Sequence, residues 1–340
     1  MKIVIPGGSG HLGRLVARNF LADGHEVVVL SREDSARAVG RVVPWDGRSR
    51  GSWVEELEGA DLVLNLAGRS VNCRYTASNL KAMMDSRVES TQAIGHAIAV
   101  ASTPPRVWMQ MSTATIYAHR FDAPNDEAAG IIGGTEPDVP RYWEYSVRIA
   151  RNWERAMDEV ELPSTRKVAL RTALVMSADP GGALDVLLTL TRLGLGGPAA
   201  GGHQYVSWIH DFDFVYAIRF VLDRPTLTGA LNVCAPNPIP HREFMRALRK
   251  ACGVNVGFPA TKWMLRAGSW ALRTDSELIL KSRRVTPGRL LDAGFEFAFP
   301  DWPHAAEDLV SASRRLNQRA NRTRRALDEV RAGHRASTDA

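Results

Sequence analysis

The chain has 340 residues, of which 45% are hydrophobic and 24% are charged, a composition typical of a folded globular protein with one large core or two smaller ones. No run of about 18 apolar residues occurs, which argues against a membrane span. Three scattered cysteines without a CxxC pair argue against a disulfide framework and against a zinc site. We therefore expect a cytoplasmic protein that holds no metal.

The net charge of +6 lies almost entirely at the C-terminal end. Residues 311–340 carry eight arginines against three acidic residues, which leaves the rest of the chain nearly neutral. Such a basic end is most often a solvated helix or a disordered tail, and a site for nucleic acid or an acidic partner is the alternative. Nucleic acid is therefore not expected as a partner.

Short apolar runs alternate with helical patterns over the first half of the chain. The runs are rich in Val, Ile and Leu, and they predict buried strands at residues 2–6, 26–31, 61–68, 106–112 and 166–175. Amphipathic segments between them predict helices near residues 12–23, 78–101 and 143–159. This alternation is typical of a parallel sheet covered by helices on both faces. The expected fold class is α/β, with a doubly wound parallel sheet of the Rossmann type.

The pattern changes after about residue 180. Residues 193–202 are rich in glycine, residues 211–222 predict a helix, and residues 229–236 predict a strand, after which helices dominate to about residue 293. We expect a dinucleotide-binding domain at 1–178, a smaller, mostly helical substrate-binding lobe at 179–303, and a basic helix or tail at 304–340. The chain is free to cross between the first two units. Ligands of such sheets bind at the carboxyl ends of the strands.

The stretch PGGSGHLG after the first strand has the spacing G-x-x-G-x-x-G at Gly7, Gly10 and Gly13. Gly7 would permit a tight turn, Gly10 would let the backbone approach a pyrophosphate, and Gly13 would let the helix pack closely on the sheet. The N-terminus of the following helix offers free N–H groups and a positive dipole end to phosphate. This context predicts a dinucleotide site, and a glycine-rich loop without a ligand is the alternative.

The end of the second strand indicates which dinucleotide binds. A carboxylate there would bind the ribose hydroxyls of NAD, but the sequence places Ser31 and Arg32 at this point. Arg32 can pair with the 2′-phosphate of NADP(H), which a carboxylate would repel. Glu33 and Asp34 follow, and they are the ribose ligands in the alternative case in which the strand ends later. We expect NADP(H).

Several motifs together resemble the extended, or atypical, short-chain dehydrogenase/reductase superfamily, namely PGGSGHLG, NLAG at 65–68, MSTATIY at 111–117 and SWIH at 207–210. More narrowly, the chain is similar to the epimerase family branch, which is described as nucleoside-diphosphate-sugar epimerase-like. The stretches that carry this similarity lie at 45–47, 85–91, 170–175, 181–184, 192–198, 205–213 and 288–300. The resemblance covers residues 1–303.

The resemblance implies a cofactor site at the carboxyl ends of the first strands. The residues that would surround the pyrophosphate are Gly7, Ser9, Gly10, His11, Leu12 and Gly13. Asn65, Ala67 and Gly68 would lie along the cofactor, with Asn65 closing a buried strand end as the alternative. Ser112 or Thr113 would hydrogen-bond a substrate oxygen, unless this hydroxyl cluster, with Thr115, merely caps a turn.

The catalytic pair of the superfamily is a tyrosine followed four residues later by a lysine, whose ammonium lowers the pKa of the phenol. None of the six tyrosines here is followed by such a lysine. Alignment places Tyr145 at the tyrosine and Ile149 at the lysine. Arg148 lies near the same helix face and could hold the cofactor, but arginine is not a proton relay near neutral pH. In the alternative, Tyr145 is a packing aromatic and Arg148 is a surface charge.

Substrate contacts are expected from the segment YVSWIHDFD at 205–213 and from two arginines. Trp208 could stack on a ring or a sugar face, and His210 could donate a hydrogen bond. The alternative is a core tryptophan that precedes an N-capped helix. Arg74 and Arg87 could contact a phosphate or carboxylate of the substrate, although solvent-facing arginine is the commoner case.

The expected function is that of an NADP(H)-dependent oxidoreductase or epimerase with a site that lacks the usual lysine. Its substrate would be a small carbonyl or sugar-like molecule, including a nucleotide sugar. The alternative is a non-catalytic NADPH-binding sensor or scaffold, which the missing lysine favours. The enzyme is preferred because hydride transfer needs chiefly cofactor geometry and a polarised carbonyl.

Overall fold

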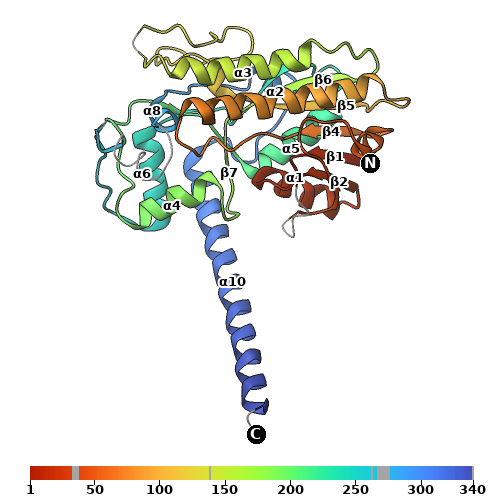
Figure 1. Ribbon diagram of the computed structural model, residues 1–340. Helices are drawn as coiled ribbons and strands as arrows, with labels where there is room; N and C mark the ends of the chain where they lie inside the picture. Colours follow the sequence, from red (N-terminus) through yellow and green to blue (C-terminus); the bar gives the residue numbers. More distant parts are fainter. Residues whose placement is uncertain (33–37, 138, 262, 266–275, 339–340) are drawn as a thin grey trace.

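A computed structural model describes residues 1–32, 38–137, 139–261, 263–265 and 276–338, with side chains described as far as residue 323. Figure 1 shows a body of sheet and helices from which one long helix projects. No helix among these residues has the length and apolar character needed to cross a bilayer.

A seven-stranded parallel sheet, in the order β10-β6-β5-β4-β1-β2-β3, forms the centre of the body. The strands are β1 Lys2–Pro6, β2 Glu26–Ser31, β3 Arg41–Pro44, β4 Leu62–Asn65, β5 Val107–Thr113, β6 Arg166–Thr172 and β10 Gly229–Val233. The order reverses at β1, which pairs with β2 on one side and β4 on the other. Doubly wound sheets bind ligands outside the carboxyl ends at this point.

The sheet differs from the sequence expectation in three places. The strand expected at 61–68 ends at Asn65, and the strand expected at 166–175 divides into β6 and the short β7, Leu174–Met176, which pairs with β9, Trp208–His210. The edge strand β3 was not predicted. It has only four residues, none of them fully buried, so it lacks the continuous apolar run of the central strands.

Helices cover both faces of the sheet, which confirms the expected fold class. On one face, α1, His11–Ala22, and α5, Asp211–Leu222, pack their apolar sides on strands β1, β2 and β6. On the other face lie α2, Ala77–Ala99, α3, Trp143–Asp158, and the 3-10 helix η1, Ser52–Leu57. Figure 1 shows α2 and α3 side by side across this face. Burial of apolar surface under these helices stabilises the fold by about 25 cal/mol for each Å² removed from water.

The C-terminal lobe is mostly helical, as expected. Its helices are α4 Ala183–Arg192, α6 His241–Cys252, α8 Glu277–Leu280 and α9 Gly288–Asp292, and its short strands are β8 Tyr205–Val206 and β11 Ile239–Pro240. Its core contains Trp208, Phe244 and Trp302. Because α5 and β10 return to the main sheet, the chain crosses between the lobe and the sheet more than once.

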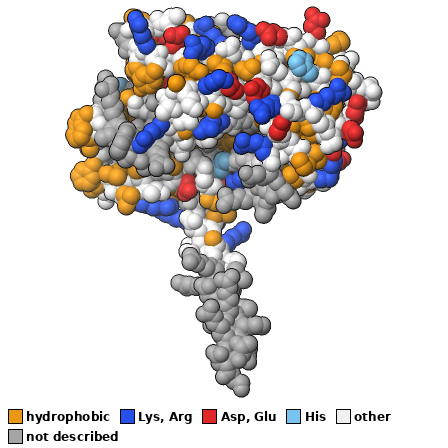
Figure 2. All heavy atoms as spheres, viewed as in Figure 1, with side chains coloured by type: hydrophobic (Ala, Val, Ile, Leu, Met, Phe, Trp, Pro, Cys, Tyr) orange, Lys and Arg blue, Asp and Glu red, His pale blue; other side chains and the backbone are white. Residues whose placement is uncertain are grey.

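The helix that projects from the body is α10, Trp302–Thr338. Its first turns bury Trp302, Leu309 and Val310 against α6, and its later part extends away from the body (Figure 1). The basic C-terminal segment is therefore helical as far as Thr338. On the visible face of the body, acidic and basic side chains are intermixed (Figure 2), in keeping with its nearly neutral charge.

Candidate functional site

The glycine loop lies between β1 and α1, at the point where the strand order reverses. Gly7 has a φ of +76°, and a Cβ there would lie 2.7 Å from the Cα of Ala67. A Cβ at Gly13 would lie 2.4 Å from the Cα of Gly8, so only glycine allows the helix to pack this closely. These contacts agree with the turn and packing roles expected for Gly7 and Gly13.

The N-terminus of α1 is open to a ligand. Its N-cap is Gly10, which is exposed and provides no side-chain hydrogen bond to the helix. A Cβ at Gly10 would meet only the Gly7 carbonyl oxygen, at 3.3 Å. The free N–H groups of the first turn therefore keep their capacity to bind an anion.

His11 adds an unsatisfied polar group to this loop. Both ring nitrogens are buried and have no hydrogen-bond partner among the described residues. Gly182, the N-cap of α4, lies against the ring, since a Cβ there would be 2.7 Å from Nε2 of His11. Burial lowers the pKa of His11, which favours the neutral ring. A buried ring without partners beside free helix N–H groups fits a ligand with polar oxygens.

The end of β2 is joined to the loop by a hydrogen bond. Ser31 Oγ donates to Ser9 Oγ at 2.9 Å, and the exposed Arg32 follows directly. Glu33 and Asp34, the alternative ribose ligands, lie outside the described residues. Leu12 packs its side chain on the core, so its contribution to a ligand is restricted to its backbone. The loop and the strand end together fit a dinucleotide that carries phosphate groups.

The side chain of Asn65 forms its hydrogen bonds inside the protein. Its side chain is fully buried, donates from Nδ2 to Gln110 Oε1 at 2.9 Å, and accepts from the Ala67 N–H at 3.0 Å. These contacts agree with the alternative expected for Asn65, in which its amide closes the end of β4. By doing so it holds Ala67 next to Gly7 and sets the course of the backbone to the exposed Gly68.

The structure separates the two hydroxyl candidates at the end of β5. Ser112 is buried and donates to Glu154 Oε1 at 2.5 Å, and Glu154 forms an ion pair with Arg171 at 2.8 Å. The expectation that Ser112 is catalytic is therefore corrected, because its hydroxyl is part of the buried core. Thr113 is half-buried, and its Oγ1 accepts the Thr115 N–H at 3.2 Å, which leaves its own hydroxyl hydrogen available to a ligand.

Tyr145 lies in the first turn of α3 and is half-buried. Ile149 is buried, so no cation occupies the position of the family lysine. Arg148 is exposed, and its Cζ lies 4.3 Å from the centroid of the Tyr145 ring, over the face of the ring rather than in a pair with the phenol oxygen. On α2, Asp85 raises the pKa of Lys81, and Tyr145 adds a smaller effect of the same sign.

A cluster of charged residues from 277–283 reaches the same region, and the sequence reasoning missed it. Glu277 accepts from Ser146 Oγ at 2.6 Å. Lys281 Nζ donates to the Thr115 carbonyl at 2.8 Å, and Arg283 Nε donates to Thr115 Oγ1 at 3.1 Å. Burial lowers the pKa of Lys281 to about 8. The run KSRR at 281–284 was the available signal, but a charge run ordinarily indicates a solvated surface.

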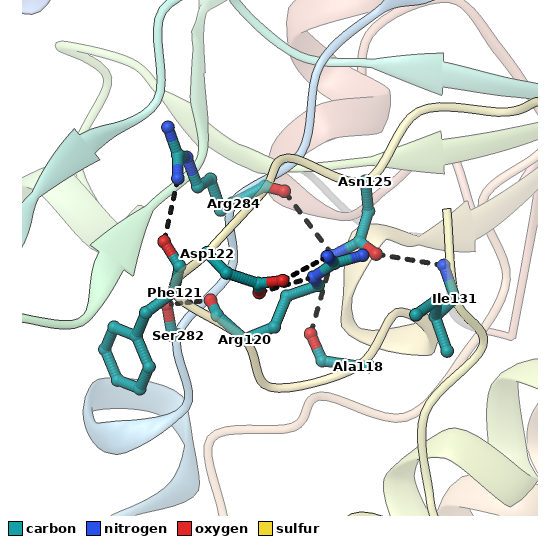
Figure 3. Close-up of polar contacts among 8 residues, drawn as sticks. All are labelled: Ala118, Arg120, Phe121, Asp122, Asn125, Ile131, Ser282 and Arg284. Carbon is teal, nitrogen blue, oxygen red and sulfur yellow. Dashed lines mark hydrogen bonds and ion pairs between the residues drawn. The ribbon is translucent and has the colours of Figure 1, made fainter. Parts of the chain in front are cut away.

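Hydrogen bonds hold this segment against the loop that follows β5, as Figure 3 shows. Ser282 Oγ donates to the Arg120 carbonyl at 3.0 Å, and Arg284 Nη1 donates to the Phe121 carbonyl at 2.8 Å. The Asn125 N–H in turn donates to the Arg284 carbonyl at 2.7 Å. Residues 282 and 284 are thus fixed on the loop, while the residues between and before them contact Thr115.

The arginines expected at the substrate lie in different settings. Arg87 on α2 is half-buried, with its Cζ 4.9 Å from the centroid of the Trp153 ring. A Cβ at Gly68 would lie 3.4 Å from Arg87, which places the guanidinium beside the end of the β4 loop. Arg74 is exposed and lines an open pocket together with other residues of the loop before α2 and Asn79 of α2. Arg87 is therefore the better placed of the two for a ligand at the sheet edge.

The substrate contacts expected of Trp208 and His210 are corrected, because both side chains are buried and engaged inside the protein. Trp208 is fully buried, and its ring centroid lies 5.0 Å from that of Trp302. His210 is the N-cap of α5, where Nδ1 accepts the Phe212 N–H at 3.1 Å and the ring stacks on Phe299 at 3.8 Å. The alternative of a core tryptophan before an N-capped helix is what the structure contains. Among the described residues, no group of His, Cys, Asp or Glu is arranged to hold a metal.

Comparison with known proteins gives matches over most of the chain. Residues 3–234 match the NAD dependent epimerase/dehydratase family, and residues 260–309 match a domain of unknown function, DUF1731. Human SDR39U1, an epimerase family protein, is 30% identical over 316 residues, which cover 92% of this chain and 100% of the human protein. YfhF of Bacillus subtilis, also an epimerase family protein, is 27% identical over 312 residues, covering 92% and 98%.

Solved structures show the same fold. The crystal structure of human SDR39U1 with NADPH is similar with a TM-score of 0.78 at 28% identity, covering 92% of this chain and 99% of that one. A nucleoside-diphosphate sugar epimerase from Corynebacterium glutamicum has a TM-score of 0.69 at 23% identity, covering 97% and 68%. The family expected from the sequence motifs is thus confirmed. The chain belongs to the NAD dependent epimerase/dehydratase family, among the relatives called epimerase family proteins.

Proposed function

We propose that this protein binds NADP(H) and uses it in an oxidoreductase or epimerase reaction on a small carbonyl or sugar-like substrate. The glycine loop carries the proposal, because its open Gly10 N-cap and the unpartnered ring of His11 fit a phosphate-bearing ligand. Family membership and the human relative solved with NADPH support the same cofactor class.

Each part of the cofactor has residues suited to it. The N–H groups at the start of α1 would bind the pyrophosphate, and Arg32 would pair with the 2′-phosphate. The backbone at Ala67 and Gly68 would lie along the remainder. When bound, the nicotinamide would exchange a hydride with a carbonyl or alcohol carbon of the substrate.

Thr113 is the residue best placed to polarise a substrate oxygen. Its hydroxyl is half-buried at the carboxyl end of β5, with the hydrogen free to donate. A donor held in place before the reaction stabilises charge that develops on a carbonyl oxygen. Tyr145 would be a second donor, with no lysine at the fourth residue after it.

A non-catalytic NADPH sensor is the second candidate, and the buried Ile149 favours it. In this case the cofactor would change the affinity for a partner without turnover. Oxidation of bound NADPH by compounds from a carbonyl library would support the enzyme. Cofactor-dependent partner binding in the absence of turnover would support the sensor.

Calorimetric titration with NADPH and NADH tests the cofactor assignment. We expect NADPH to bind at least about tenfold more tightly, a difference of about 1.4 kcal/mol. Arg32→Ala should remove most of this preference, whereas Arg50→Ala, at another exposed arginine, should leave it unchanged. Equal affinities of the unaltered protein for the two cofactors would overturn the assignment.

A further inference from the structure

Two arginines at the carboxyl edge of the sheet donate their hydrogen bonds to carbonyl and hydroxyl oxygens. Arg87 Nη1 donates to the carbonyl oxygens of Arg69 and Met83, at 3.0 and 3.1 Å. Arg283 donates to Thr115 Oγ1 at 3.1 Å and to the carbonyls of Leu278 and Lys281. Within the described ranges neither guanidinium forms an ion pair, and both arginines are half-buried.

Both arginines lie at the ends of neighbouring strands. Arg87 lies beside Gly68, three residues after β4, and Arg283 contacts Thr115, two residues after β5. The two strands are paired in parallel, with Asn65 opposite Gln110. The carboxyl ends of parallel strands meet at one edge of a sheet, so the two guanidiniums border the same region.

Tyr75 lies near both arginines, as its effect on each of their pKa values indicates. Burial lowers the pKa of Arg87 to about 10, with smaller opposing effects from Tyr75 and Cys73. Burial also lowers the pKa of Arg283, opposed by Glu277 and then by Tyr75. One phenol is therefore within electrostatic reach of both guanidiniums, which come from opposite ends of the chain.

Each guanidinium retains N–H groups without a protein acceptor. Arg87 uses only Nη1, and Arg283 uses Nε and Nη1, so Nε and Nη2 of Arg87 and Nη2 of Arg283 have no partner among the described residues. Arg87 has no carboxylate beside it among the described residues, and Arg283 has only the influence of Glu277. An oxyanion would supply a further counter-charge and acceptors for these N–H groups, because the guanidinium fork matches carboxylate and phosphate oxygens.

The two side chains are also held in place before any ligand arrives. Arg87 lies over the Trp153 ring on α3, and the hydrogen bonds of Ser282 and Arg284 fix the backbone on either side of Arg283 (Figure 3). Preorganised donors lose little conformational freedom when they bind.

We propose that Arg87 and Arg283 together bind one oxyanion of the substrate, a carboxylate or a phosphate, at the edge between β4 and β5. This inference rests on the proposed function, whose substrates it narrows to carbonyl or sugar-like compounds that carry such a group. The cofactor phosphates are assigned elsewhere, to the glycine loop and to Arg32, so the pair is reserved for the substrate.

Anion titration of the NADPH-saturated, full-length protein tests the proposal. Inorganic phosphate and malonate are titrated separately by calorimetry, at an ionic strength held constant with sodium chloride. We expect at least one of them to bind, and Arg87→Gln and Arg283→Gln each to weaken this binding about tenfold or more, the loss of a charge-assisted hydrogen bond. Arg155→Gln, at an exposed arginine of α3, is the matched control and should bind as the unaltered protein does.

The two anions distinguish the chemistry of the substrate group. Binding of phosphate alone indicates a substrate phosphate, and binding of malonate alone indicates a carboxylate. Arg87→Lys keeps the positive charge but loses the forked guanidinium, so it should weaken anion binding less than Arg87→Gln does. If Arg87→Gln does not fold, Arg87→Lys takes its place in the test. NADPH affinity, measured for every variant, should change less than about twofold.

Three results would overturn the proposal. In the first, neither anion binds. In the second, Arg87→Gln and Arg283→Gln bind the anion as tightly as the control does. In the third, the two variants lose affinity for NADPH and keep their affinity for the anion. The last result would assign the arginines to the cofactor. If NADPH itself does not bind, the proposed function fails, while the same titrations without NADPH still test the arginine pair.

Discussion

The glycine loop and the region around Thr115 lie at the same edge of the sheet, but they are built in different ways. The loop is mostly local, because Gly8 and Gly13 make their close contacts within a few residues or with β2, and only Gly7 packs on a distant residue, Ala67. Around Thr115, Lys281 and Arg283 arrive from more than 160 residues away. The comparison indicates that the glycine loop depends mainly on local backbone shape, whereas the proposed substrate region depends on contacts between distant parts of the chain.

The first prediction, with the largest expected effect, tests whether the glycine loop depends on its close backbone contacts. In Gly13→Val, the added Cβ would lie 2.4 Å from the Cα of Gly8, and we expect a loss in the free energy of unfolding of about 4 kcal/mol and loss of NADPH binding. Urea unfolding and NADPH fluorescence measure the two effects.

Gly10→Ala is the matched control for the loop. Its φ of −69° suits alanine, and the nearest atom to the new Cβ is 3.3 Å away. The variant should fold normally and bind NADPH more weakly, because the methyl group enters the open side of the loop. Normal NADPH binding by Gly13→Val would show that the loop does not hold the cofactor.

The sequence predicted well the features formed by residues close together in the chain, and it predicted poorly those formed by residues far apart. The strand pattern and glycine spacing predicted the sheet and the loop, because both depend on residues close together in the chain. For Asn65, Ser112 and Trp208, the same residue types suit either a ligand or a buried partner. Their partners Gln110, Glu154 and Trp302 became visible only when the fold brought them together. Lys281 and Arg283 were missed for the same reason.

The second prediction concerns Lys281 in the region around Thr115, and the pH dependence of stability that its burial causes. Burial lowers its pKa to about 8 from an ordinary value of 10.5, so the unfolded chain binds more protons than the folded one between these values. The contribution of Lys281 to the free energy of unfolding should therefore rise as the pH increases through this window, by about 3 kcal/mol in total.

Lys281→Met removes the titrating group and serves as the reference. Urea unfolding of both proteins between pH 7.5 and 10 should show the unaltered protein gaining stability relative to the variant. A constant difference over this range would mean that Lys281 is not desolvated in the folded state.

The third prediction separates the two hydroxyls of β5. Thr113→Ala should reduce kcat about 10²-fold with little change in NADPH affinity, because it removes a donor from the reacting oxygen. Ser112→Ala should instead reduce the free energy of unfolding by about 1–3 kcal/mol, because buried Glu154 loses a hydrogen bond, and should alter kcat little. Single-turnover kinetics and urea unfolding check the pair, and the reverse pattern would exchange their roles.

The smallest effect is expected at the C-terminal end, where α10 leaves the body. Trp302 stacks on Phe244 at 4.0 Å, and Arg314 Nη2 donates to the Ala251 and Cys252 carbonyls at the end of α6, at 3.3 and 3.1 Å. Residues 319–323 are all exposed. Deletion of residues 319–340 should therefore change Tm by less than about 2 °C and leave NADPH affinity unchanged. Deletion of residues 302–340 is the contrasting variant and should prevent stable folding, because it removes Trp302 and Leu309 from the core. A drop in Tm of more than about 5 °C on the shorter deletion would show that the distal part of α10 contributes to the body.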